Sequence, residues 1–295
     1  MTSRARRRLL AWLTPRPRLQ AWSLLAPGTG WLALFFVVPT LLMFGYSFMP
    51  RGLYGGVRPG FTLEHYRRFF DPLYLEILRR TFVWSLGATV ICLLMGYPVA
   101  YLIARSGRWK NLLLFLVVLP FWTSFLVRTF AMIFLLRDTG FVNTLLLGLG
   151  LIRAPLEMLY TPFAVMTGLV YGFLPFMILP IYVSLERHDR SLLEAAEVLG
   201  ARPAARFRRI TLPLSMPGVA AGCLLVFVPA LGSFLTSDLL GGAKQVMIGN
   251  LIQNQFSAAR NWPFGSAASF VVMALVLAAV LAYLRVRDAG RGEVR

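Results

Sequence analysis

Long apolar runs separated by short charged segments set the pattern of the chain. Six of these runs reach about 20 residues, the length that a helix needs to cross the hydrocarbon core of a bilayer. They cover residues 29–48, 82–104, 112–136, 162–185, 217–235 and 264–284. The pattern therefore predicts an all-α polytopic membrane protein with six transmembrane helices.

The composition supports a membrane protein. Of the 295 residues, 58% are hydrophobic and 14% are charged, whereas a soluble domain is roughly half apolar and a quarter charged. The net charge of +18 would suggest nucleic-acid binding in a soluble protein, but here the arginines lie between the apolar runs, as membrane topology requires. We therefore expect the lipid bilayer, and no nucleic acid, as a partner. Cys92 and Cys223 lie inside apolar runs, so we expect core residues and neither a disulfide nor a metal site.

Lys and Arg are distributed unevenly between alternate loops, and this predicts the orientation of the chain. With a cytoplasmic N-terminus, the inner segments carry 19 basic residues and the outer segments carry 10, while Arg128 lies inside a span. Cytoplasmic loops usually hold the excess, so we expect both termini inside the cell. We expect an uncleaved basic tail at residues 1–28, a membrane domain at 29–285 with a cytoplasmic loop at 186–216, and a cytoplasmic tail at 286–295.

The loop at residues 186–216 has the pattern of two short helices. Ser191 and Glu194 fit a capping box at the start of the first helix, and Gly200 supplies a left-handed stop. Pro203 suits the first turn of the second helix. A basic stripe on that helix follows from the spacing of Arg202, Arg206 and Arg209. Taken alone, the stripe is equally consistent with a loop anchored on anionic lipid headgroups.

The whole loop resembles a known family signature. It contains Glu194-Ala195-Ala196, then Gly200 after three residues, then Ile210-Thr211-Leu212-Pro213 after a further nine. This is similar to the signature of inner-membrane permeases of binding-protein-dependent ABC importers. The resemblance implies the type I ABC importer permease (MetI-like) fold, with the loop as a coupling helix docked on a separate ATPase. The coupling residues it implies are Glu194, Ala195, Ala196, Gly200, Arg202, Ile210 and Pro213.

The resemblance also implies a set of partners. These are two copies of an ABC ATPase, a second homologous permease and a periplasmic solute-binding protein at the bacterial inner membrane. The chain has no G-x-x-x-x-G-K-[ST] motif, and its nearest piece, Gly241-Gly242-Ala243-Lys244, lacks the spacing. We therefore expect no enzyme activity, cofactor or metal site on this chain, with ATP and Mg bound on the partner ATPase.

Further motifs resemble the spermidine/putrescine branch of this family, which implies a small organic cation as substrate. They are Tyr46-Ser47-Phe48, Leu119-Pro120-Phe121-Trp122-Thr123-Ser124, Leu239-Leu240-Gly241-Gly242, Met247-Ile248-Gly249-Asn250 and Trp262-Pro263-Phe264-Gly265. One departure is Ser233, where that branch often has an acidic residue.

Two alternatives stay open: a permease of the same class for another small solute, and a secondary transporter without an ATPase. The second alternative predicts buried carboxylates for ion coupling, and the six predicted spans contain none.

The candidate substrate-pathway residues are Trp122, Thr123, Arg128, Tyr171 and Asp238. A charged residue deep in a span costs about 2.5–3.5 kcal/mol on insertion scales, so Arg128 is expected to face the bundle interior. A structural or gating role, with Asp138 or Asp238 as the ion partner, suits it better than direct ligation of a cation. The alternative is that Arg128 lies near the outer end and snorkels.

Other polar and apolar side chains along the pathway permit two interpretations. In the first interpretation they bind a cation: Trp122 and Tyr171 offer cation–π faces, and Asp238, which follows the fifth span, offers a carboxylate. In the second, more common for such residues, they pack inside the protein or lie at the membrane interface.

Prolines and glycines inside the spans predict where helices bend and pack. Pro175, Pro180 and Pro229 favour kinks or breaks in the fourth and fifth spans. Two G-x-x-x-G pairs, Gly168 with Gly172 and Gly218 with Gly222, predict close helix packing. The outer segment at residues 244–258 alternates apolar and amide side chains, which predicts an amphipathic helix at the membrane surface.

Overall fold

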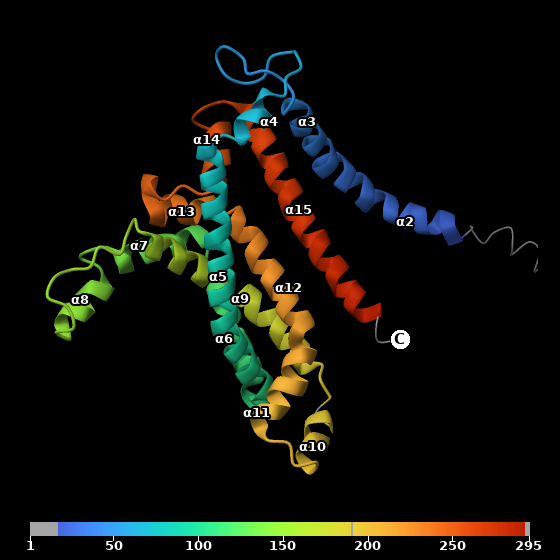
Figure 1. Cartoon of the computed structure of the whole chain (residues 1–295), viewed down its shortest axis with the longest axis vertical. Helices are drawn as coiled ribbons and strands as arrows, with labels where there is room; N and C mark the ends of the chain where they lie inside the picture. Colours follow the sequence, from blue (N-terminus) through green and yellow to red (C-terminus); the bar gives the residue numbers. More distant parts are fainter. Residues whose placement is uncertain (1–16, 190, 293–295) are drawn as a thin grey trace, which may run out of the picture.

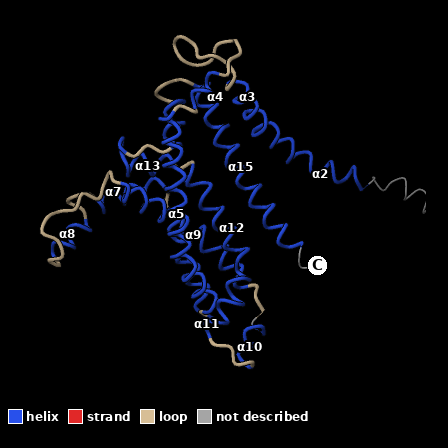
Figure 2. The backbone as a smooth tube through the Cα atoms, in the orientation of Figure 1, coloured by secondary structure: helices blue, strands red, loops and turns tan. Residues whose placement is uncertain are grey.

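The protein is described by a computed structural model over residues 17–189 and 191–292, and these ranges are almost entirely helical (Figures 1 and 2). Six helical segments in them are long and apolar enough to cross a membrane. They are Leu25–Tyr46, Pro72–Arg105, Phe125–Gly148, Pro162–Glu186, Pro203–Leu231 and Trp262–Ala282. Across the described ranges the extended pairing is confined to one isolated antiparallel bridge between Arg51 and Val57. The predicted all-α fold with six spans is confirmed.

Three long helices form the central bundle: α5 (Pro72–Arg105), α9 (Pro162–Glu186) and α12 (Leu212–Leu231). They pack against one another along their length, and the largest apolar cluster lies between them (Figure 1). Helix α9 is nearly hydrophobic all round, as expected for a helix at the centre of a bundle. The bundle therefore fixes the positions of the loops at both of its ends.

Glycines allow the close approach of α9 and α12. A Cβ added to Gly218 would lie 2.6 Å from the carbonyl oxygen of Pro180, and one added to Gly222 would lie 2.8 Å from the sulfur of Met177. The predicted packing role of this pair is confirmed. Cys92 is fully buried and its thiol donates to the carbonyl oxygen of Val170 at 3.6 Å, which confirms it as a core residue.

The predicted third span, residues 112–136, is not one helix. Three elements replace it: α6 (Lys110–Val118), the 3-10 helix η3 (Leu119–Trp122) and α7 (Phe125–Leu136). Thr123 and Ser124 are extended, with ψ of 147° and 139°. Pro120 lacks an N–H, and the tight turn that contains it ends the first helix. The prediction of a continuous helix here is therefore wrong.

Helix α7 turns away from the bundle and continues into α8 (Phe141–Gly148), so that the two form a projecting arm (Figure 1). By contrast, α9 and α12 run through Pro175, Pro180 and Pro229 without interruption. The break in the bundle thus lies at Pro120 and not at the prolines that the sequence favoured.

The first and last spans lie at the side of the bundle. The first consists of α2 (Pro17–Leu32), the π-helix η1 (Ala33–Val37) and α3 (Val38–Tyr46), and the last is α15 (Trp262–Gly292). They meet near their outer ends, where the Phe44 and Phe270 rings lie 5.0 Å apart. Elsewhere they diverge (Figure 1), and none of the apolar window of the first span is buried inside the protein.

The outer end of the bundle is capped by short helices. They are α4 (Glu64–Phe69), α13 (Phe234–Gly241), the 3-10 helix η5 (Gly242–Lys244) and α14 (Ile248–Phe256). Helix α14 is amphipathic, as predicted. However, its apolar side chains, such as Ile248, pack on Phe69 and Phe264. Protein, and not the membrane surface, therefore covers its apolar face.

Candidate functional site

The loop between α9 and α12, which the sequence predicts to be cytoplasmic, consists of two short helices joined at a glycine. Helix α10 (Ser191–Val198) is followed by α11 (Pro203–Arg206), the π-helix η4 (Phe207–Thr211) and then α12. Gly200 has φ +76°, and its N–H donates to the carbonyl oxygen of Glu197 at 2.9 Å. The N–H of Ala201 donates to Ala196 at 2.9 Å, so the last carbonyl groups of α10 are satisfied. The predicted two-helix loop with a left-handed stop is confirmed.

The start of α10 differs from the predicted capping box. Helix α10 begins with Ser191 itself, so Ser191 is not the residue before the helix, and the box with Glu194 is wrong. Instead the Oδ1 atom of Asp189 accepts the N–H of Ser191 at 2.9 Å. This backbone hydrogen bond lowers the pKa of the Asp189 carboxyl below its ordinary value. The group that satisfies the first turn therefore lies two residues earlier than the sequence suggested.

An ion pair links the two helices of the loop. The Nη1 atom of Arg206 donates to Oε2 of Glu197 at 2.5 Å. Arg206 is half-buried, while Arg202 and Arg209 of the same predicted stripe are exposed. One of the three arginines is thus used inside the loop, which leaves a smaller basic surface for lipid or a partner than the stripe implied.

Three apolar side chains in and directly after α10 are exposed. Val198 and Leu199 are 88% and 86% exposed, and Leu192 is about half exposed at 49%. We call these three residues the α10 patch. Apolar side chains exposed to this degree at a helix end mark a contact surface for another molecule.

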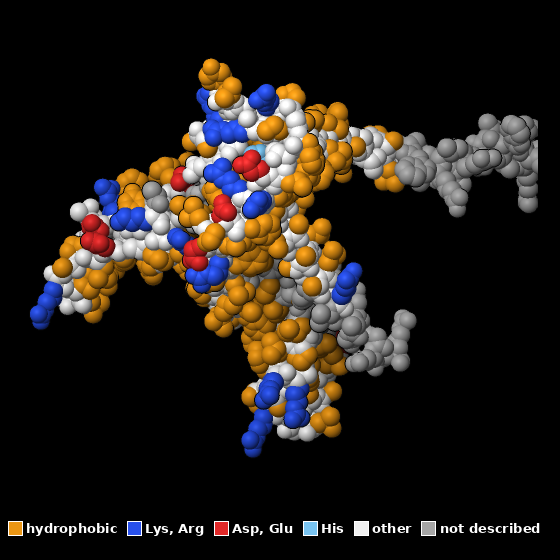
Figure 3. Space-filling model, turned by 45° about the horizontal axis from the view of Figure 1, so that its top comes forward, with side chains coloured by type: hydrophobic (Ala, Val, Ile, Leu, Met, Phe, Trp, Pro, Cys, Tyr) orange, Lys and Arg blue, Asp and Glu red, His pale blue; other side chains and the backbone are white. Residues whose placement is uncertain are grey.

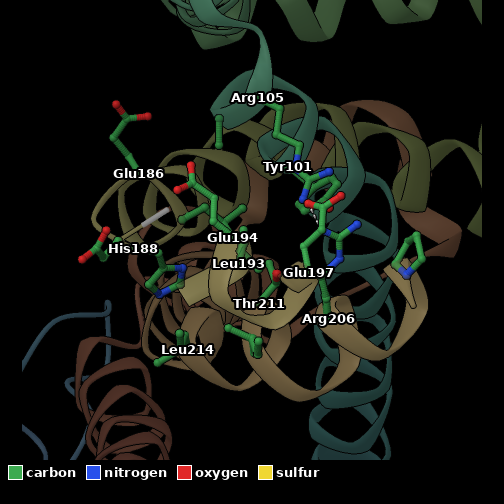
Figure 4. A pocket seen from close by; sticks show the side chains of 15 residues that line it. Tyr101, Arg105, Glu186, His188, Leu193, Glu194, Glu197, Arg206, Thr211 and Leu214 are labelled. Atoms are coloured by element: carbon green, nitrogen blue, oxygen red, sulfur yellow. Dashed lines mark hydrogen bonds and ion pairs between the residues drawn. The ribbon is translucent and has the colours of Figure 1, made fainter. Parts of the chain in front are cut away.

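A cavity of about 540 Å³ separates the inner side of the loop from the bundle (Figure 4). Glu194, Glu197 and Arg206 line it from the two loop helices, and Ile210 and Thr211 line it from the end of η4. Two of the implied coupling residues, Glu194 and Ile210, therefore face the bundle side of the loop.

Beside this cavity, Lys110 Nζ lies 2.6 Å from Oε1 of Glu186 and joins α6 to the end of α9. This contact raises the pKa of Lys110.

Two of the five predicted pathway residues meet in one place. Arg128 and Tyr171 line a pocket of about 10 Å³ between α7, α9 and α13, which is far too small for an organic solute. The guanidinium carbon of Arg128 lies 4.8 Å from the centre of the Phe121 ring and 5.6 Å from that of Phe125. Arg128 therefore faces the protein, as expected, but is held by two aromatic rings.

The predicted ion partners of Arg128 are not in contact with it. Asp138 and Asp238 are both exposed, and no ion pair to Arg128 occurs in the part of the chain that the structure describes. The Nε and Nη1 atoms of Arg128 are buried without a hydrogen-bond partner among the described residues. The predicted pairing is therefore wrong, because α7 turns away at the helix break and Asp238 points to the surface of α13.

The remaining pathway residues lie around the break in the third span. Trp122 is exposed at the end of η3, and the hydroxyl of Thr123 donates to the carbonyl oxygen of Pro120 at 2.7 Å. Helix α13, which carries Asp238, packs against both α7 and α9. The structure thus groups the five residues on neighbouring elements, without a solute-sized cavity between them in this conformation.

The sequence did not identify Asn250 as a structural anchor. Its Nδ2 donates to the carbonyl oxygen of Phe234 at 2.9 Å, and its Oδ1 accepts the N–H of Met247 at 3.1 Å and the hydroxyl of Ser237. Asn250 thereby fixes α13 to α14. The only signal was its place in the Met247–Asn250 motif.

No group of three His, Cys, Asp or Glu residues suited to a metal ion occurs among the described residues.

Comparison with known proteins finds relatives that are all permeases of transport systems. Residues 77–287 match the family described as binding-protein-dependent transport system inner membrane component. The spermidine/putrescine transport system permease protein PotB of Escherichia coli (strain K12) is 48% identical over 84% of this chain and 92% of its own length. PotB of Haemophilus influenzae is 46% identical over 86% and 90%.

A solved structure has the same fold. It is a bacterial alginate ABC transporter in complex with an alginate pentasaccharide-bound periplasmic protein. A chain of that transporter superposes with a TM-score of 0.74 at 19% identity, covering 89% of this chain and 92% of its own. Its low identity limits the comparison to the fold.

Proposed function

The chain belongs to the family of binding-protein-dependent transport system inner membrane components, and on this premise we propose that it is the permease subunit of an ATP-driven importer for polyamines such as spermidine and putrescine. The substrate rests on the names of relatives that are 46–48% identical over most of the chain. The chain is a multi-pass inner-membrane transport subunit and not an enzyme in its own right.

The cytoplasmic loop is the observation that carries the coupling role. Gly200 supplies the left-handed turn between α10 and α11, and the side chains of the α10 patch are exposed. We propose that the α10 patch enters a cleft of a separate ATPase, which binds ATP and Mg. The coupling residues are Glu194, Ala195, Ala196, Gly200, Arg202, Ile210 and Pro213. Glu194 and Ile210 line the cavity between the loop and the bundle.

The proposed assembly contains two copies of the ATPase, a second homologous permease and a periplasmic solute-binding protein, with both termini of this chain in the cytoplasm. Support for a second permease comes from the arm of α7 and α8, whose apolar side chains are uncovered on much of their surface. The pathway residues Trp122, Thr123, Arg128, Tyr171 and Asp238 lie where this arm leaves the bundle. A second subunit beside the arm would complete a path that one chain alone does not enclose.

Reconstitution tests this proposal. The chain, its partner permease and the ATPase are placed in proteoliposomes with the binding protein, and uptake of labelled putrescine and spermidine is measured. Uptake is expected to require both ATP and the binding protein. Uptake driven by an ion gradient without ATP would favour a secondary transporter. ATP-dependent uptake of a different solute, with no polyamine uptake, would keep the permease class and overturn the substrate.

A further inference from the structure

A rigid apolar tip stands at the outer end of the molecule, in the loop between the first and second spans. Tyr54 is 98% exposed and Leu53 is 93% exposed. The loop that carries them extends beyond the ends of α3 and α15 (Figure 1), so it lies past the apolar spans. Both side chains stay outside the apolar clusters that the described residues form. We call Leu53 and Tyr54 the outer tip.

The tip is held in place from both sides. Within the loop, Gly55 N–H donates to Gly52 at 3.1 Å and Gly52 N–H donates to Gly56 at 3.2 Å. Toward the last span, Gly56 N–H donates to the carbonyl oxygen of Arg260 at 2.9 Å. These bonds close a compact turn and fasten it to a second, distant segment of the chain. The tip is therefore preorganised, and little conformational entropy is lost when it binds a partner.

Three further features concern the segment that holds the loop, Ala259 and Arg260, which we call the clamp. Arg260 has φ +47°, a left-handed conformation that is uncommon for a residue with a side chain. A Cβ on Gly55, which has φ +95°, would lie 2.7 Å from the Cβ of Arg260. In addition, Nη2 of Arg51 donates to the carbonyl oxygen of Ala259 at 2.7 Å. Strained backbone of this kind persists where the surroundings determine it, and it clusters at functional sites.

The surface around the tip is basic. Residues 49–81 contain six arginines against three carboxylates, and Arg51, Arg58 and Arg260 lie beside the tip in the loop and its clamp. Figure 3 shows Lys and Arg side chains at this end of the molecule, with Asp and Glu side chains among them. A free polyamine cation is repelled by such a surface, whereas a protein with carboxylates around its binding mouth is attracted.

We propose that the outer tip is the anchor on which the polyamine-loaded binding protein docks, with Tyr54 and Leu53 entering an apolar depression beside its acidic mouth. This inference rests on the proposed function, because a carrier of a polycation needs carboxylates where the ammonium groups enter. Aromatic anchors flanked by arginine have the composition of binding hot spots. The basic rim then favours delivery by the carrier over direct entry of free substrate.

The test uses the complete importer in lipid nanodiscs, with ATP hydrolysis titrated against polyamine-loaded binding protein. Tyr54→Ala and Leu53→Ala are each compared with Leu73→Ala, an exposed leucine on the first turn of α5. The tip variants are expected to raise the half-maximal binding-protein concentration at least tenfold and to leave the maximal rate unchanged. Because the tip side chains are uncovered, their truncation removes no internal packing. Leu73→Ala is expected to stay within twofold of wild type.

A photo-crosslinking amino acid at position 54 supplies a second measurement, and its expected adduct is with the binding protein. Adducts with lipid or with a second copy of the chain would overturn the docking role, as would tip variants within twofold of wild type. A binding protein that carries another solute and still depends on the tip would overturn the polyamine substrate alone. No response of wild type to any binding protein would exclude both the proposed function and this site.

Discussion

Arg206 and Glu197 join the two short helices between α9 and α12 across the turn at Gly200, with Nη1 and Oε2 separated by 2.5 Å. The two residues are nine positions apart in the sequence, and their contact connects α10 to α11. Half-exposed ion pairs of this kind contribute about 0.5 kcal/mol, so the pair sets the angle of the helices more than it stabilises the fold.

Breaking this pair is expected to weaken coupling modestly. Arg206→Glu and Glu197→Arg should each lower binding-protein-stimulated ATP hydrolysis about two- to threefold, in line with the energy of such a pair. The double exchange should recover most of the loss. Arg209→Glu, an exposed member of the same stripe, is the matched control and should change little. Equal effects of Arg206→Glu and Arg209→Glu would mean that total loop charge matters and the pair does not.

Gly200 is expected to tolerate asparagine and to reject valine. The space around its Cβ position is empty, so the penalty comes from the left-handed backbone alone, at roughly 1–2 kcal/mol for a residue with a side chain. Asparagine visits this region more readily. Transport by Gly200→Val should therefore fall, with the six spans still inserted, while Gly200→Asn stays near wild type. Gly148→Val, at an open position without a positive φ, is the control. Equal transport by Gly200→Val and wild type would refute a coupling role for the turn.

Asp189 is expected to stabilise the first turn of α10 as an acceptor. Asp189→Ala should speed hydrogen exchange of the α10 amides several-fold, while Asp189→Asn, which keeps an acceptor, should change it less. Since the folded pKa lies below the ordinary value of 3.8, the stabilisation is complete above that value and is lost as pH falls through the folded pKa. The difference between Asp189→Ala and wild type should therefore be constant between pH 5 and pH 8. A difference that changed within this range would point to another group.

Arg128 is expected to brace the break in the third span. Its guanidinium group lies over Phe121 before the break and Phe125 after it, and such contacts contribute about 0.5–2 kcal/mol each. Arg128→Ala should reduce transport at least fivefold with normal assembly. Arg128→Lys should recover part of the activity, because an ammonium group keeps the charge but lacks the planar head. Full transport by Arg128→Ala would leave the residue without a gating role.

Gly168 and Gly218 are expected to respond differently to a second substitution. A Cβ on Gly168 would meet Leu240 Cδ1, the end of a side chain, whereas one on Gly218 would meet the backbone oxygen of Pro180 at 2.6 Å. Overpacking costs about 1–3 kcal/mol. Gly168→Ala and Leu240→Ala should each lower the unfolding temperature of the purified importer, and the double variant should lose less than the sum of the two, because the buried Leu240 no longer meets the added methyl group. Gly218→Ala with Ser184→Gly should show no such recovery, because the carbonyl group remains. Recovery in both pairs would contradict the assigned contacts.

Periodicity and turn chemistry predicted the elements that depend on local sequence. Apolar length located the six spans, and Gly200 and Pro203 located the two helices of the loop, because a left-handed stop and a fixed first turn are properties of single residues. Helix α5 begins ten residues before the predicted second span, because polar side chains such as Glu76 end the apolar run there while the helix continues. Hydropathy also missed the break at Thr123, because a segment with extended backbone can carry side chains as apolar as those of a helix.

The site depended more on tertiary contacts than the sequence revealed. The aromatic rings that hold Arg128 come from both sides of a helix break that hydropathy does not register. Similarly, the apolar face of α14 is covered by Phe69 and Phe264, which lie far away in the chain. The outer tip gave no signal at all, because two apolar residues in a glycine-rich loop are uninformative until the clamp by Arg260 is seen.

The contact between the first and last spans has a consequence for biogenesis. Phe44 belongs to the first span that leaves the ribosome, and its partner Phe270 belongs to the last. The three helices of the bundle can therefore associate while the first span still diffuses beside them in lipid. The first span is expected to stay accessible to lipid crosslinkers until α15 has been inserted. Nascent chains arrested before and after residue 270 would report that transition, and protection in the shorter chain would exclude this order of assembly.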